Sequence, residues 1–294
     1  MKKDLEFEVN REDTLLPFLL SALSGESRNY VKGVLKRGQI TVNGKPCTDY
    51  ARRLVPGQRV CVLREAPRKK ADIGFPVIFE DDDLIVIDKP AGMLAVATDD
   101  ERENTAYYMV NSYLKSKNKA GRVFIVHRLD RETSGVMLFA KSEQVKYALQ
   151  ENWNDAVIRR GYIAVVEGKV TPPEATVKSW LRETKTLLVY SSKNEGDGKL
   201  AITNYKTVKA TDKYTMLDIS LETGRKNQIR VHMKDIGHPI AGDKKYGAVT
   251  ATFKRLGLCA SVLSLTHPTS GEAMSFEAKI PSVFEKVFRQ NPEV

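Results

Sequence analysis

Short apolar runs joined by turn residues dominate the chain after residue 75, and they limit the folds that it can adopt. PVIFEDDDLIVIDKP predicts two strands around an acidic turn, TMLDISL alternates like a half-buried strand, and LSLTHP and AMSFEAKIP predict two more. Helical patterns are fewer: they are SEQVKYALQENWNDA, which is capped by Ser142, and QIRVHMKDIG, which ends at Gly237. Consecutive strands joined by tight turns pair antiparallel. We therefore predict a mixed, mainly antiparallel α+β domain over residues 76–294, in preference to a doubly wound parallel sheet.

The first 64 residues predict a separate, small α/β domain. The apolar helix LLPFLLSAL comes first, and a second helix begins at Ser27 and ends at Gly38. Asn43-Gly44 lies between two strand-like runs, which is the strongest short signal for a β-hairpin. EAPRKKADIGF at residues 65–75 combines Pro, Gly and a basic run, which is typical of a linker.

The positive charge of the chain is concentrated in one segment. The 294 residues include 47 Lys or Arg and 37 Asp or Glu, which gives a formal net charge of +10. Residues 28–70 alone contain twelve basic and two acidic side chains, so their surplus equals the net charge of the whole chain. In the second predicted helix, Arg28, Lys32 and Lys36 recur every four residues, opposite an apolar face. This asymmetry is typical of a basic module that binds a polyanion.

The sequence argues against secretion, membrane insertion and a structural metal. MKKDLEFEVN lacks the apolar core of a signal peptide, and apolar stretches such as LLPFLL are far shorter than the ~20 residues of a membrane span. Cys47, Cys61 and Cys259 are odd in number and widely spaced, which favours a reducing compartment over a disulfide framework. The four histidines lack the close spacing of a zinc site. We therefore expect a cytoplasmic protein without a metal.

The stretch VFIVHRLDRETSGVMLFAKS concentrates side chains that can carry chemistry. Two apolar runs, at residues 123–126 and 136–140, bracket a polar loop, so two predicted strands present charged side chains at their ends. In one interpretation Asp130 only accepts backbone N–H bonds within the Thr-Ser-Gly turn. In the other, Arg128 and Arg131 keep the carboxylate ionised and available as a nucleophile. Residue spacing alone leaves both interpretations open.

HRLDRETSG resembles the signature of the RluA-like family of pseudouridine synthases, which isomerise uridine in ribosomal and transfer RNA. Three further stretches follow in that family's order: RRGYIAVVEG, ETGRKNQIRVHMKDIGHPIAGDKKYG and LTHPTSGE. The resemblance covers residues 76 to about 281, and residues 1–64 separately resemble an S4 RNA-binding domain. Four ordered motifs together are far more specific than any one of them. The implied organisation is an S4-like domain, a linker at 65–75 and a pseudouridine synthase domain at 76–294.

The resemblance implies roles for individual residues. Asp130 matches the aspartate that reacts with the target nucleotide, so that the glycosidic bond of uracil breaks and the base is rejoined through C5. Arg128 resembles the arginine that fills the RNA stack in place of the flipped nucleotide; its alternative role is an ion pair with Glu132. Tyr162 matches the tyrosine that stacks on the target base and takes part in the later proton removal, although a strand tyrosine is commonly a packing residue. Arg230 matches the basic residue that pairs with the catalytic carboxylate, and on spacing alone it also fits a solvated cationic helix face.

One position departs from the family pattern. Asn227 stands where GRxHQIR usually has histidine, and an amide can hydrogen-bond but cannot become a cation or shuttle a proton. Asp130, Tyr162 and Arg230 are all retained, so activity is still expected.

The implied partner is RNA, ribosomal or transfer RNA, bound by a monomer. Isomerisation needs neither redox chemistry nor phosphoryl transfer, so no cofactor is implied, and the chain lacks GxGxxG and Walker patterns. Besides Arg128, the candidate RNA-binding side chains are Arg28, Lys32, Lys36, Arg37, Arg52 and Arg53.

Two other functions compete with this interpretation. The first is a non-catalytic RNA-binding factor of ribosome assembly that retains the fold, although such a protein would have little reason to keep Asp130, Tyr162 and Arg230 together. The second is a glycosidase-like hydrolase. It needs two opposed carboxylates, and only the sequence neighbour Glu132 is evident near Asp130.

Overall fold

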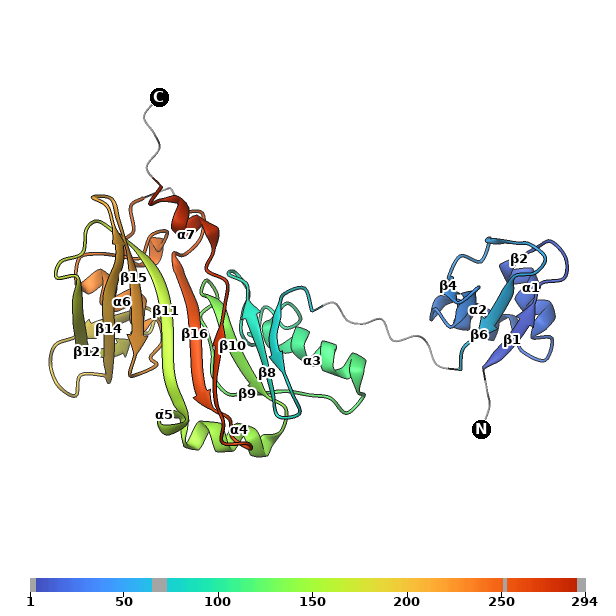
Figure 1. The fold of residues 1–294 in the computed structure, drawn as a ribbon, viewed down its shortest axis with the longest axis horizontal. Helices are drawn as coiled ribbons and strands as arrows, with labels where there is room; N and C mark the ends of the chain where they lie inside the picture. Colours follow the sequence, from blue (N-terminus) through green and yellow to red (C-terminus); the bar gives the residue numbers. More distant parts are fainter. Residues whose placement is uncertain (1–3, 65–72, 251–252, 290–294) are drawn as a thin grey trace, which may run out of the picture. The chain divides into compact units, whose positions relative to one another are not determined.

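Figure 1 shows the chain as a computed structural model, which describes residues 4–64, 73–250 and 253–289. The chain divides into two compact units, Met1–Lys70 and Ala71–Val294. Most of the predicted linker at 65–75 lies outside the described residues. Among the helices that the structure describes, none is both long and apolar enough to cross a membrane.

The first unit, the N-terminal unit, packs two short helices against small sheets. One sheet has the strand order β1-β6-β3-β4 and the other pairs β2 with β5. Their apolar side chains form one buried cluster that includes Leu15, Val31 and Val60. The elements are β1 (Leu5–Glu8), β2 (Asp13–Thr14), α1 (Leu15–Ala22), α2 (Arg28–Lys36), β3 (Ile40–Val42), β4 (Lys45–Pro46), β5 (Arg53–Leu54) and β6 (Arg59–Val62).

The second helix and the hairpin of this unit agree with the sequence patterns. Ser27 caps α2, because its hydroxyl oxygen accepts a bond from the backbone N–H of Tyr30 at 3.2 Å. The apolar face of α2 is buried, and its cations at every fourth position are exposed. Asn43 and Gly44 have φ of 50° and 76°, as a two-residue hairpin turn requires, so the predicted hairpin between β3 and β4 is confirmed.

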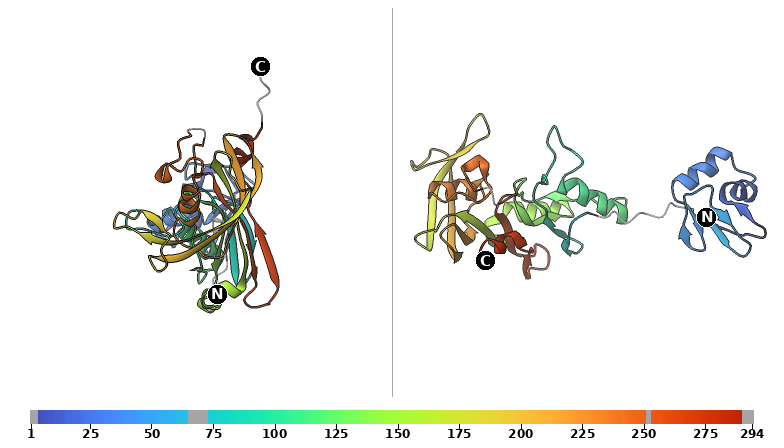
Figure 2. Two further views of the ribbon diagram at one scale, coloured as in Figure 1. Left: turned by 90° about the vertical axis from the view of Figure 1, so that its left-hand side faces the viewer. Right: turned by 90° about the horizontal axis from the view of Figure 1, so that it is seen from above.

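The second unit, the C-terminal unit, is built on one sheet of eleven strands. Its main path is β13-β12-β14-β15-β11-β16-β10-β8-β7, with β17 paired to β16 and β9 to β10. Every strand pair is antiparallel except β10 with β16, and the sheet twists along its length (Figure 2). The predicted mixed, mainly antiparallel α+β architecture is therefore confirmed. The elements are β7 (Val77–Glu80), β8 (Leu84–Lys89), α3 (Ala106–Lys117), β9 (Phe124–Ile125), β10 (Ser134–Ala140), α4 (Glu143–Glu151), α5 (Trp153–Ala156), β11 (Val157–Glu167), β12 (Glu174–Glu183), β13 (Val189–Ser192), β14 (Lys199–Ala210), β15 (Tyr214–Leu221), α6 (Gln228–Asp235), the 3-10 helix η1 (Lys244–Tyr246), β16 (Leu258–Thr266), β17 (Ala273–Glu277) and α7 (Ser282–Lys286).

The helix expected from Ser142 onward is two helices rather than one. Its chain stops being helical at Asn152, which has φ of −108° and ψ of 25°. The side-chain amide of Asn152 donates to the carbonyl oxygen of Ala148, and its own carbonyl oxygen accepts from Asp155 and Ala156. These local hydrogen bonds end α4 and start α5, as Asn often does when it competes with the helical backbone.

The strands that support the candidate loop are buried on both faces. Residues of β8 and β10 alternate between two apolar clusters, because successive strand side chains point to opposite faces. Ile85 and Phe139 face α3, whereas Val86 and Leu138 face α4. Because both faces of these strands are buried, their sequences are almost continuously apolar and do not alternate between apolar and polar residues.

Gly135 allows β10 to lie unusually close to β16. Its φ is +116°, and a methyl group added there would lie 2.1 Å from the carbonyl oxygen of Ala260. Gly135 pairs with Ala260 in the one parallel contact of the described sheet, directly after the polar loop. The glycine thereby fixes where this loop lies relative to β16.

We predict that Gly135→Ala destabilises the C-terminal unit by about 2 to 4 kcal/mol, because overpacking against backbone adds to an unfavourable φ. Both tryptophans, Trp153 and Trp180, lie in the C-terminal unit, so urea unfolding followed by tryptophan fluorescence reports on it alone. Gly196→Ala is the control: Gly196 lies in the same unit and has φ of +79°, but a methyl group there meets no atom within 4 Å, so the loss of stability should be smaller. An unchanged transition for Gly135→Ala would contradict the close strand crossing.

Candidate active site

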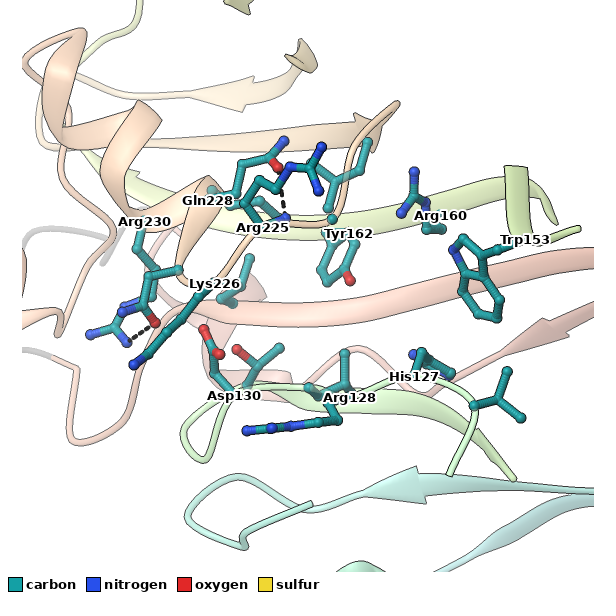
Figure 3. Close-up of a pocket in the computed structure, with 18 of the residues that line it drawn as sticks. His127, Arg128, Asp130, Trp153, Arg160, Tyr162, Arg225, Lys226, Gln228 and Arg230 are labelled. Atoms are coloured by element: carbon teal, nitrogen blue, oxygen red, sulfur yellow. Dashed lines mark hydrogen bonds between the residues drawn. The ribbon is translucent and has the colours of Figure 1, made fainter. Parts of the chain in front are cut away.

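The polar loop at residues 127–133 faces β11 and the beginning of α6 across a cleft (Figure 3). The cleft has a cavity volume of about 500 Å³. It brings together Arg128, Asp130, Tyr162 and Arg230, which the sequence predicts as site residues and which come from three separate stretches of the chain. Among the residues that the structure describes, no cluster of three or more His, Cys, Asp or Glu side chains could hold a metal ion.

The carboxylate of Asp130 is not used to cap its own turn. The backbone N–H of Thr133 donates to the backbone carbonyl oxygen of Asp130 at 3.1 Å, so the main chain closes the turn by itself. Within the described parts of the chain, the carboxylate has no hydrogen bond and no ion pair, and it points into the cleft (Figure 3). The side chain is therefore available to a bound molecule.

Burial raises the pKa of the Asp130 carboxyl above its ordinary value, because a charge is less stable away from water. Four cations act in the opposite direction; in order of decreasing effect they are Arg230, Arg128, Lys226 and Lys89. The expectation that Arg131 supports this carboxylate is wrong. Arg131 instead binds the carboxylate of Glu101 at 3.1 Å and the carbonyl oxygen of Gly92 at 3.0 Å.

Lys89 is a functional residue that the sequence interpretation missed. It ends β8 and is fully buried, and its ammonium group donates to the carbonyl oxygens of Pro90, Met93 and Arg131 at 3.0, 2.8 and 3.1 Å. Burial lowers its pKa to about 8. The bond to Arg131 ties the residue after Asp130 to the end of β8. Its only sequence signal is a lysine at the end of an otherwise apolar strand.

Tyr162 lies on β11 opposite the carboxylate of Asp130 (Figure 3). Its ring is half-buried and packs against two apolar clusters, so a packing role and exposure to the cleft coexist. Burial raises the pKa of its hydroxyl to about 12; Arg160 opposes this, whereas Asp130 and Cys259 reinforce it. Tyr162 is therefore a neutral phenol at neutral pH.

Arg230 is anchored by a residue that the sequence interpretation did not identify. Its Nε and Nη2 atoms each lie 2.7 Å from a carboxylate oxygen of Asp243, whose side chain is 1% exposed. The predicted direct pair between Arg230 and Asp130 is not formed, because this bidentate partner holds the guanidinium. Arg230 lowers the pKa of Asp130 only by its charge, without a hydrogen bond to the carboxylate. The interpretation of a solvated cationic face fails for Arg230, which is largely buried.

Asn227 takes part in the same network. Its side-chain oxygen accepts from Nη1 of Arg230 at 3.1 Å, and its amide donates to the hydroxyl of Tyr246 at 3.0 Å. The guanidinium of Arg230 also lies over the ring of Tyr246, 4.9 Å from its centre. Asn227 thus positions Arg230 through hydrogen bonds that need no charge on the residue.

The helix that carries Arg230 is itself held by a buried histidine. The two ring nitrogens of His232 lie 2.9 Å from the hydroxyl of Ser179 and 2.8 Å from that of Thr203. Burial lowers the pKa of His232 to about 4, so the ring is neutral. These bonds attach α6 to β12 and β14.

Arg128 is exposed at the mouth of the cleft. The alternative ion pair with Glu132 is not formed, and Arg128 has no acidic partner within the described ranges. The cleft also contains residues that the sequence interpretation did not single out. Next to Arg128, His127 packs against Trp153 with 5.3 Å between ring centres, and Arg160 of β11 also lines the cleft.

The six candidate cations of the N-terminal unit differ in how free their charges are. Arg28, Lys32, Lys36 and Arg52 are exposed and have no ion pair with any described residue. Arg53 pairs with Glu12 at 2.6 Å. Nε of Arg37 donates to the side-chain oxygen of Gln39 at 2.6 Å. The strongest candidates for contact with an anion are therefore the four cations without an ion pair, Arg28, Lys32, Lys36 and Arg52.

The chain is similar to one family along most of its length. The family described as RNA pseudouridylate synthase matches residues 83–235, and the S4 domain matches residues 15–60. An uncharacterised RNA pseudouridine synthase of Aquifex aeolicus is 32% identical over 315 residues, which cover 97% of this chain and 96% of that protein. A ribosomal large subunit pseudouridine synthase D of Neisseria meningitidis serogroup B is 33% identical over 296 residues, covering 95% of this chain and 78% of that protein.

A solved structure shares the fold. The human RNA pseudouridylate synthase domain containing 4 superposes with a TM-score of 0.59 at 23% identity, over 71% of this chain and 90% of that chain.

The electrostatics of the cleft make a prediction for two neighbouring arginines. Arg128→Gln removes a cation that faces Asp130, so the pKa of the Asp130 carboxyl should rise and a smaller fraction should be ionised at a given pH. Arg131→Gln is the matched control, because the charge of Arg131 is engaged by Glu101. The measurement is an NMR titration of the side-chain carboxyl carbon. Equal shifts in both variants would contradict this assignment of charges.

Proposed function

Because the chain belongs to the RNA pseudouridylate synthase family, we propose that it converts specific uridines of ribosomal RNA to pseudouridine, with Asp130 as the catalytic nucleophile. The predicted resemblance to this family and to the S4 domain is confirmed, and the chain is an RNA pseudouridine synthase. One observation carries the proposed role of Asp130. Its carboxylate has no partner among the described residues, although it lies in a cleft with cations around it.

The target uridine must leave the RNA stack to reach this carboxylate, because enzymes that act on a base extrude it from its neighbours. Arg128 is exposed at the mouth of the cleft, where its guanidinium can take the place of the extruded base. The ring of Tyr162 lies opposite Asp130, where it can stack on the extruded uracil.

The reaction rearranges bonds without adding or removing atoms. The carboxylate of Asp130 attacks the nucleotide, the bond between C1′ and N1 breaks, and the uracil turns so that C5 bonds to C1′. C5 then loses its proton, N1 ends with one, and Asp130 is released as a carboxylate. No oxidant, reductant or group donor is consumed, so the residues of the cleft are sufficient.

The high pKa of Tyr162 limits when it can act as a base. A phenol with a pKa of about 12 holds its proton while the charged carboxylate of Asp130 faces it. When Asp130 is bonded to the substrate, its negative charge is gone, and one cause of the raised pKa is removed. Two effects then still raise the pKa of Tyr162, namely burial and Cys259, and Arg160 still lowers it. Proton removal by Tyr162 is therefore less unfavourable after the covalent step than before it, although burial still raises its pKa.

Ribosomal RNA is proposed on the names of relatives. Proteins of Neisseria meningitidis and Salmonella typhimurium, each 33% identical to this chain, are named ribosomal large subunit pseudouridine synthase D. A transfer RNA substrate, a monomeric state and a cytoplasmic location stay predictions that accompany this proposal. The free cations of the N-terminal unit would supply sequence-independent contacts with phosphates.

We predict that Asp130→Asn abolishes isomerisation and leaves RNA binding largely intact, because the amide keeps the shape of the side chain but is a poor nucleophile. Uridine and pseudouridine have equal mass, so the assay follows tritium release from C5-labelled RNA. Glu132→Gln is the matched control: it makes the same chemical change two residues away and should retain activity. Tritium release by Asp130→Asn at the wild-type rate would remove Asp130 from the mechanism. Free uracil as the product would support the hydrolase alternative.

We also predict that Arg28→Gln/Lys32→Gln/Lys36→Gln lowers the slope of log affinity against log salt by about two to three, because each phosphate contact contributes about 0.7 to 0.9. Arg53→Gln/Arg59→Gln is the comparison, since Glu12 and Glu6 already pair with these arginines. For each charge removed, this double variant should lower the slope of log affinity against log salt by less than the triple variant does. An unchanged slope in the triple variant would show that this face of α2 does not contact RNA.

A further inference from the structure

A second concave surface of the C-terminal unit shares no residue with the active-site cleft. We call it the α3 groove; it lies between helix α3, which Figure 1 shows beside β8, and the loop that returns from this helix to β9. Its cavity volume is about 600 Å³. The side chains that line it are Tyr107, Tyr108, Asn111, Lys115, Lys119 and Arg122.

The shape of the α3 groove is fixed by hydrogen bonds on both sides. The side chain of Asn111 donates to the carbonyl oxygen of Tyr107 at 2.9 Å and accepts from the N–H of Val123 at 3.0 Å, so it joins the helix to the returning loop. Gly121 packs this loop against the helix end, since a methyl group there would lie 2.8 Å from the carbonyl oxygen of Leu114. The α3 groove is therefore preformed, and a ligand need not order it.

The chemistry of the α3 groove is aromatic and cationic. Lys115, Lys119 and Arg122 are exposed, and none has an ion pair with any described residue. Among the described residues, no acidic side chain lines the α3 groove, and Tyr108 is 44% exposed. Lys117 differs from these three, because it pairs with Glu80 at 2.7 Å. The guanidinium of Arg122 lies over the ring of Phe124, 5.3 Å from its centre. Cations without an acidic partner beside an exposed aromatic ring are typical of surfaces that bind single-stranded nucleic acid.

The α3 groove is connected to the active site by a short stretch of chain. Arg122 lies six residues before Arg128, and β9 runs between them. Six extended residues span at most about 20 Å, so an RNA strand whose target lies in the cleft has neighbouring nucleotides within reach of the α3 groove.

We propose that the α3 groove binds an unpaired stretch of substrate RNA that flanks the target uridine. Phosphates lie against Lys115, Lys119 and Arg122, and one base stacks on Tyr108. This inference rests on the proposed function, because it takes the RNA in the cleft as the source of the flanking strand.

The test measures RNA affinity of the full-length chain at several salt concentrations. Lys115→Gln/Lys119→Gln/Arg122→Gln should lower the slope of log affinity against log salt by about two, at about 0.7 per phosphate of a single strand. The control is Lys169→Gln/Lys178→Gln/Lys213→Gln, which removes three exposed cations from other parts of the C-terminal unit and should leave the slope unchanged. Tyr108→Ala should weaken binding about fivefold or more, whereas Tyr108→Phe keeps the stacking ring. On an oligonucleotide too short to reach the α3 groove, all variants should bind like the wild type.

Several results would overturn the proposal. The proposal fails if Lys115→Gln/Lys119→Gln/Arg122→Gln has the same slope of log affinity against log salt as the wild type. An acidic protein would then be the better candidate for the occupant of the α3 groove. An equal loss of affinity on the short oligonucleotide would also overturn the proposal, because it would place the effect in the cleft or in folding. The binding assay needs no turnover. Absence of tritium release from the wild type would therefore contradict the proposed function without deciding the role of the α3 groove.

Discussion

A carboxylate withdrawn from water is unstable unless positive charge faces it, and the surroundings of Asp130 follow from this constraint. The cations come from three places: Lys89 from the end of β8, Arg128 from the loop itself, and Lys226 and Arg230 from the segment just before α6 and from its first turn. Three of them are held by other groups, since Arg230 binds Asp243, Lys226 binds Glu183 and Lys89 binds backbone carbonyls. The site thus concentrates positive potential on Asp130 without occupying its oxygens, which is the state that a nucleophile requires.

This arrangement depends on the frame that brings the three segments together. The loop of Asp130 is fixed by Lys89 on one side and by the close crossing of Gly135 with Ala260 on the other. The neutral ring of His232 attaches α6 to the sheet and so determines where Arg230 can reach. These residues touch no substrate in the proposed mechanism, yet the potential at the carboxylate depends on their positions.

Much of the fold could be predicted from local patterns, whereas Asp130, Arg128, Tyr162 and Arg230 were proposed as site residues because of the family resemblance. The strand, polar loop and strand around Asp130, the amphipathic helix α2 and the Asn43-Gly44 hairpin are each specified by neighbouring residues, so sequence was sufficient for them. Contacts between side chains that lie far apart in the sequence could not be predicted in this way. Arg128 and Arg131 have the same side-chain chemistry and lie in the same loop. Arg131 is held by Glu101, thirty residues earlier, and by the carbonyl oxygen of Gly92, whereas Arg128 acts on Asp130. The spacing of residues around Asp243 does not indicate that it binds Arg230. The position of Lys89 is fixed by backbone carbonyl groups, which every residue has, so the sequence does not indicate it.

The most direct test of the account is a map of pseudouridines in total ribosomal and transfer RNA. It compares a strain that lacks the gene with the same strain expressing either the wild-type chain or Asp130→Asn at equal abundance. The account predicts that particular ribosomal RNA positions lose pseudouridine in the deletion strain, regain it with the wild type and fail to regain it with the variant. Identical maps in all strains, or full restoration by Asp130→Asn, would contradict it.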